Sequence, residues 1–183
     1  DGAVRADPSV PAWTDTDLLR LGSDFLRTIT IEEPGQAPVN ISKQGSGVDA
    51  SYSIEPMPAG RELGSPSQFA RLFGSVAMLT FTDVRSARDD VPAPEHVLRY
   101  TTTTGSEFRI DAWSQRDEHG ENSTWITIRY EGSQEVRNRL EGWAYQLTPY
   151  TAQAFTMGVD DLTYEAVEPD QPVEGPPSGG PGG

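Results

Sequence analysis

The sequence predicts an α+β fold in which two tandem β-β-β-α repeats place their helices on one face of an antiparallel sheet. Two groups of short stretches have apolar residues at alternate positions, which is typical of strands with one buried face. Each group is followed by a stretch with apolar residues at helical spacing, and turn residues separate the elements. The repeats cover about 25–84 and 96–164. Their short internal connections favour antiparallel neighbours, because parallel strands need a long crossover.

The first repeat is expected to contain three strands, a helix and a further strand. Each of the three strands has two apolar residues separated by one other residue, and a proline or glycine follows. The pairs are Ile29 and Ile31, Val39 and Ile41, and Tyr52 and Ile54. Ser65 and Pro66 predict a helix start, because serine caps the first turn and proline fits its first position. The apolar stripe of this helix is Phe69, Leu72, Phe73 and Val76. The further strand is expected over 79–84.

The second repeat follows the same order of elements. Strands are expected over 97–103, 108–113 and 125–130. In the middle one, Phe108, Ile110 and Ala112 alternate with Arg109, Asp111 and Trp113. Ser133 predicts the start of a helix whose apolar positions are Val136, Leu140 and Trp143. Thr148 and Pro149 predict a second, short helix.

The composition excludes several classes of function. The chain has 183 residues and a formal net charge of −14, which disfavours nucleic acid and anionic membranes as partners. It contains no cysteine, so disulfides, thiolate metal sites and thiol nucleophiles are excluded. No glycine motif for a phosphate and no nucleophile elbow occur. We therefore expect no cofactor and no metal site.

The two ends differ in composition from the middle of the chain. Residues 1–17 show no periodic pattern, and 168–183 form an acidic tail rich in proline and glycine. We expect a single domain over 18–167 between them. Within the tail, Pro176 and Pro177 are candidate partner contacts, because an extended proline segment loses little entropy on binding. The chain does not begin with methionine, and we expect any membrane anchor to lie upstream of residue 1.

Three stretches carry a resemblance to a known family. They are 25–31 at the first strand, 65–84 from the first helix into the next strand, and 141–150 running on to 160–162. The last includes the sequence Gly142-Trp143-Ala144-Tyr145. On these features the chain resembles bacterial domain-of-unknown-function family 4340, of ABC-exporter and gliding-motility-associated auxiliary proteins. The resemblance implies an extracytoplasmic domain that follows an N-terminal membrane anchor, and it supplies no catalytic residues.

Two pairs of adjacent carboxylates and two histidines are the candidates for chemistry. Asp89-Asp90 and Asp160-Asp161 are able to bind Ca²⁺ or act as acid and base, but adjacent side chains need further partners to form a site. We expect the first pair in a solvated loop and the second at a helix start or turn. His96 and His119 lie in separate segments without metal-ligand spacing, and we expect ordinary surface histidines.

Trp113 is the candidate contact residue within the domain. It is out of phase with the apolar residues of its strand, so it should face the opposite side of the sheet. An exposed tryptophan there would anchor a partner. We therefore expect a non-catalytic binding or scaffold subunit that is periplasmic or otherwise extracytoplasmic. Its partner would be a protein of a membrane assembly. The alternative is a carboxylate-dependent hydrolase or metal-dependent enzyme.

Overall fold

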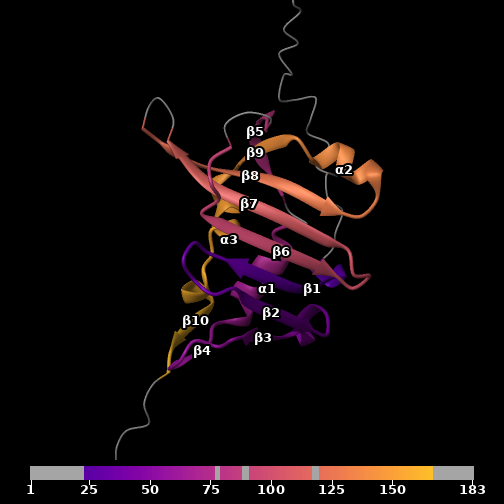
Figure 1. Ribbon diagram of the computed structural model, residues 1–183. Helices are drawn as coiled ribbons and strands as arrows, with labels where there is room; N and C mark the ends of the chain where they lie inside the picture. The colour runs from indigo at the N-terminus through magenta and orange to yellow at the C-terminus, as the bar shows by residue number, and fades with distance from the viewer. Residues whose placement is uncertain (1–22, 77–78, 88–90, 117–119, 167–183) are drawn as a thin grey trace, which may run out of the picture.

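The computed structural model describes residues 23–76, 79–87, 91–116 and 120–166. These residues form ten strands and three α-helices (Figure 1). The strands are β1 Leu26–Glu32, β2 Val39–Gln44, β3 Ser51–Glu55, β4 Arg61–Leu63, β5 Phe81–Ser86, β6 His96–Thr102, β7 Glu107–Arg116, β8 Asn122–Glu131, β9 Trp143–Leu147 and β10 Thr163–Glu165. The helices are α1 Pro66–Gly74, α2 Gln134–Leu140 and α3 Pro149–Phe155, and a 3₁₀ turn, η5, covers Val159–Leu162. None of the helices in the described ranges is long and apolar enough to cross a membrane.

Eight of the strands form one antiparallel sheet, in the order β3-β2-β1-β6-β7-β8-β9-β5. It consists of two meanders, β1 to β3 and β6 to β9, that are joined where β1 pairs with β6. Strand β5 pairs with β9 at the far edge, and β4 and β10 form a separate two-stranded sheet. The expected layout of two tandem β-β-β-α repeats is therefore wrong. The described part of the protein is mostly β, with ten strands against three short helices, and pairing between β1 and β6 merges the strands of the two halves into a single sheet.

A second correction concerns the segment after α2. The helix was expected to continue through Trp143, but it ends at Leu140, and Trp143 begins β9. Gly142 has a φ of +85°, a conformation that side chains with a Cβ rarely adopt, and it ends the helical direction of the chain. In β9, Ala144 and Tyr145 are both buried although they are neighbours. Burial on both faces removes the alternation by which strands are detected in sequence.

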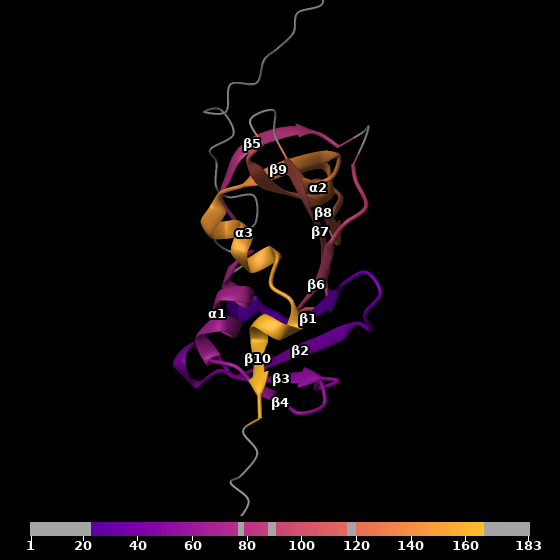
Figure 2. The same cartoon turned by 90° about the vertical axis from the view of Figure 1, so that its left-hand side faces the viewer.

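One face of the large sheet, here called the inner face, packs against α1 and α3 and holds the main core (Figure 2). The expected burial of Phe69, Leu72, Phe73 and Val76 is confirmed, because all four are at most 1% exposed. The first three lie on α1, whereas Val76 follows the end of the helix at Gly74. The predicted start of α1 is also confirmed. The hydroxyl of Ser65 accepts a hydrogen bond from the Ser67 amide, and the Gln68 side chain accepts one from the Ser65 amide.

On the opposite side, here called the outer face, lie described residues of the connection between β5 and β6. Strand β5 lies beyond β9 at the sheet edge, so β9, β8 and β7 separate it from β6. Ala87 packs against a small cluster of Trp113, Trp125 and Ala144 on the outer face. Farther along, Pro92 and Pro94 face side chains of β7 and β8 across a pocket. Residues 87 and 91–95 are called the crossing segment below.

Candidate functional site

Three arginines lie side by side across the outer face, on β6, β7 and β8. The register pairs Arg99 with Arg109, and Arg109 with Arg129. Directly opposed side chains on antiparallel strands point to the same face, and like charges in such positions repel. This arginine row is therefore stable only if acidic side chains lie close to it.

Acidic residues lie on both sides of the arginine row. On one side, the Nε of Arg99 lies 2.6 Å from a carboxylate oxygen of Glu32, and the Nε of Arg109 lies 2.7 Å from one of Asp111. On the other side, Glu107 and Glu131 oppose each other across β7 and β8. The hydrogen bond to Glu32 is the largest cause that raises the pKa of Arg99 above its usual value. The arginine row and the carboxylates on its two sides thus form one array of both charges.

Asp111 is the central carboxylate of this array and is 5% exposed. Its Oδ1 binds Arg109, and its Oδ2 lies 3.4 Å from a terminal nitrogen of Arg129. The Arg129 side chain is 65% exposed, so this second contact is long and open to water. One buried carboxylate therefore orients two guanidinium groups.

A pocket of about 470 Å³ lies between these side chains and the crossing segment. Val91, Pro92 and Pro94 form an apolar wall. The floor and the rim come from β7, β8 and the residues that follow α2. These are Arg109, Asp111, Thr127, Arg129 and Glu141. The volume lies in the range of pockets that bind small molecules or single peptide side chains.

A second pocket, of about 360 Å³, lies where the β1–β2 turn, the start of β6 and η5 meet. It brings together Glu33, His96, Asp160 and Asp161. The Nδ1 of His96 lies 3.2 Å from a carboxylate oxygen of Glu33, and both side chains are about four-fifths buried. His96 is thus partly buried beside a carboxylate, whereas an ordinary surface histidine was expected.

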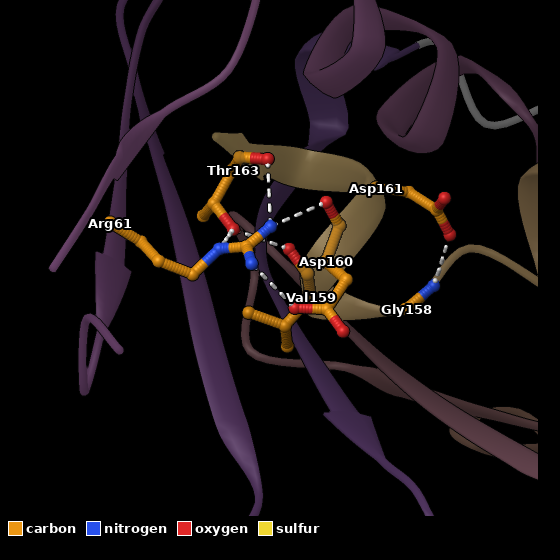
Figure 3. Close-up of polar contacts among 6 residues, drawn as sticks. All are labelled: Arg61, Gly158, Val159, Asp160, Asp161 and Thr163. Atoms are coloured by element: carbon orange, nitrogen blue, oxygen red, sulfur yellow. Dashed lines mark hydrogen bonds and ion pairs between the residues drawn. The ribbon is translucent and has the colours of Figure 1, made fainter. Parts of the chain in front are cut away.

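The two aspartates of this pocket have different partners (Figure 3). Asp160 pairs with Arg61 at 3.1 Å, and the Asp161 carboxylate accepts a hydrogen bond of 3.0 Å from the amide of Gly158. Arg61 also donates to the Thr163 hydroxyl at 2.6 Å, which joins β4 to β10. The aspartates therefore stabilise a turn, as expected from the sequence. Within the described ranges, no group of three or more acidic or histidine side chains is placed to hold a metal ion.

Trp113 lies on the face opposite to Phe108, Ile110 and Ala112, as its phase in the strand predicts, but it is not exposed. Its side chain is 1% exposed and packs with Trp125 and Ala144 in the outer cluster. The expectation of an exposed contact residue needs correction, because the cluster that includes Ala87 and Trp125 buries the ring. The alternation of residues in β7 predicted the face on which Trp113 lies, but it did not predict which side chains cover the ring.

Several other predicted residues lie outside the described ranges. These are Pro176, Pro177, Asp89, Asp90 and His119. Arg109, Asp111 and Arg129 were not among the candidates predicted from the sequence. The available signal was the phase of β7, in which charged residues alternate with buried apolar ones. The position of Arg129 beside them depends on the register between β7 and β8, which no local pattern gives.

Comparisons with known proteins give no match for this chain. No family model matches, and neither does any curated protein or solved structure. The resemblance to family 4340 therefore stays a prediction, and the function has to be argued from the structure.

Proposed function

We propose that this protein is a non-catalytic binding or scaffold subunit that holds a protein partner on the outer face of its large sheet. The observation that carries the proposal is the pocket between the arginine row and the crossing segment. It combines charged groups in fixed positions with an apolar wall, as binding surfaces commonly do. The apolar side chains of the inner face are covered by the protein's own helices, whereas this pocket is open.

The location of the subunit belongs to the same proposal. We infer a periplasmic or other extracytoplasmic position and association with a membrane assembly. The support is the resemblance to family 4340 and the acidic surface, which favours a protein partner over nucleic acid. Fractionation of cells that express the complete gene product tests the location, and recovery in the cytoplasmic fraction would contradict it.

A carboxylate-dependent hydrolase or metal-dependent enzyme is the second candidate. The pocket that contains His96, Glu33 and two aspartates favours it, because a histidine beside a carboxylate is a common general base. Against it, both aspartates already have partners within the fold. Screening the wild type and His96→Gln with ester, amide and phosphate ester substrates tests this candidate. Turnover that the variant loses would support an enzyme.

Site-specific photo-crosslinking tests the proposed binding face. A photoreactive amino acid at Glu141, on the rim of the outer pocket, should give a protein adduct in native membranes. The matched control places it at Tyr150, which is 61% exposed and lies on α3 at the other side of the sheet. Adducts from both positions or only from Tyr150 would contradict the outer face as the binding surface.

A further inference from the structure

We propose that the outer pocket recognises the carboxylate of an acidic, extended peptide segment and binds it through Arg109 and Arg129. This inference rests on the proposed binding function and adds the chemistry of the partner. The peptide would place a glutamate or aspartate side chain on the two guanidinium groups and an aliphatic or proline residue against Val91 and Pro92.

Arg109 and Arg129 have hydrogen-bond donors that the described residues do not use. Arg109 uses its Nε for Asp111, and Arg129 has only the 3.4 Å contact with the same carboxylate. No other hydrogen bond or ion pair links these guanidinium groups to the rest of the described chain. A guanidinium group has five N–H donors, so two such groups around one carboxylate leave most of their donors available.

The arrangement of the charges leads to the same ligand. The pocket is lined by two arginines and two carboxylates, Asp111 and Glu141, so its formal charges balance. The Glu141 carboxylate accepts the Tyr130 amide and forms no ion pair with either arginine, so Asp111 is the carboxylate that the two guanidinium groups contact within the described residues. A second carboxylate from a ligand would complete the array. Arginine binds carboxylates in a planar, two-pronged geometry that favours this group.

Arg99 lies in the same row but should not take part. Its Nε donates a hydrogen bond to Glu32, so this guanidinium group has a carboxylate of its own. Arg99 also does not line the pocket. The crossing segment covers the Arg109 and Arg129 end of the row only. Arg99 is therefore an internal control of the same residue type on the same face.

The net charge of the protein favours a short peptide segment over a larger polyanion as the ligand of the pocket. At −14 the protein repels nucleic acid and anionic bilayers, which would extend well beyond the pocket and face the acidic surface around it. A short acidic segment of a partner contacts only the pocket. At physiological salt, acidic groups more than roughly 8 Å from the pocket are largely screened. The apolar wall fits such a segment, because it contacts the residues next to the carboxylate.

Titration calorimetry with the full chain tests the proposal. The ligand is the blocked peptide acetyl-Gly-Pro-Glu-Val-Pro-Gly-amide, and the matched control ligand has glutamine in place of glutamate. We expect the glutamate peptide to bind about tenfold more tightly than the glutamine peptide, the usual order for a charged hydrogen-bonding group. Arg129→Gln and Arg109→Gln should each remove that preference, whereas Arg99→Gln should keep it within about twofold.

Three outcomes would overturn the proposal. They are equal affinity for both peptides, an Arg99→Gln effect as large as that of Arg129→Gln, and no binding of the glutamate peptide by the wild type. Arg129 is mostly exposed, so Arg129→Gln remains informative even if Arg109→Gln does not fold. The photo-crosslink at Glu141 tests the proposed binding function independently of the proposed carboxylate ligand. If the adduct forms but the glutamate peptide is not preferred, the binding function stands and the carboxylate ligand is rejected. If there is neither an adduct nor a preference for glutamate, the binding function and the carboxylate ligand are both rejected.

Discussion

The two faces of β7 are both largely buried, but they are buried by different means. On the inner face, Phe108, Ile110 and Ala112 join the main core beneath the helices. On the outer face, Asp111 and Trp113 are equally inaccessible. They are covered by charged neighbours, by a second tryptophan and by a residue of the crossing segment. Burial alone therefore does not separate the core face of this sheet from the face that we propose to bind a partner.

The difference lies in what the buried groups need. Apolar side chains of the inner face require only close packing, so that face is fully closed. The carboxylate of Asp111 requires hydrogen-bond donors, and its donors are arginines whose remaining N–H groups reach the pocket. A buried acid on a partly covered face thus links the fold to the proposed binding site.

Removing a core side chain of the inner face should have the largest effect on stability. Phe73 is fully buried and contacts Tyr52, with ring centroids 5.6 Å apart. Phe73→Ala should lower the free energy of unfolding by about 3–5 kcal/mol, because it removes a core side chain and leaves a cavity. Urea unfolding measures the change. Tyr150→Ala is the control, since that aromatic ring is exposed, and it should cost less than about 1 kcal/mol. Similar losses for the two variants would show that Phe73 is not part of the core.

Alkaline pH should weaken the inner face through its buried tyrosines. Burial raises the pKa of Tyr145 from 10.0 to about 12, and it also raises the pKa of Tyr100. The unfolded chain then loses its phenol proton before the folded chain does. The stabilisation is complete below pH 10 and is lost as the pH rises towards 12.

The variant Tyr145→Phe isolates one of these two groups. Two pKa units correspond to about 3 kcal/mol at most, and the variant should show a correspondingly smaller loss of stability between pH 10 and pH 12. Urea unfolding at several pH values measures it. An unchanged pH dependence would mean that Tyr145 ionises as freely in the folded state as in the unfolded state.

Local features of the fold were accessible from the sequence, whereas the pairing of distant strands was not. Ser65 and Thr148 cap α1 and α3, because capping depends on residues three or four positions apart. The junction of β1 with β6 joins residues about 70 positions apart, such as Ile29 and Tyr100. Nothing in either strand distinguishes this partner from another, so the sequence predicted two repeats in place of one sheet.

The candidate site shows the same division. The outward phase of Asp111 was visible in the alternation of β7. Its low exposure was not, because its neighbours on the outer face include residues of other strands, such as Arg129 of β8. The crossing segment lies on the outer face because β5 pairs with β9, a strand that is distant in the sequence. Trp113 was misjudged for the same reason.

The outer face offers a comparison of two carboxylates that differ mainly in burial. The Asp111 side chain is 7% exposed and the Glu32 side chain 32%, and each binds an arginine Nε at 2.6–2.7 Å. Asp111→Asn keeps the size of the side chain but removes its charge beside two arginines. It should lower the free energy of unfolding by about 1–2 kcal/mol, towards the lower end for charged hydrogen bonds because both arginines are partly exposed.

Glu32→Gln should cost only about 0.2–1 kcal/mol, as is usual for a solvent-exposed ion pair, and 1 M salt should remove most of that difference. Urea unfolding of both variants at low and high salt measures the contrast. A larger or equally salt-resistant effect for Glu32→Gln would show that the two ends of the arginine row are alike. The special position of Asp111 beneath the pocket would then lose its energetic basis.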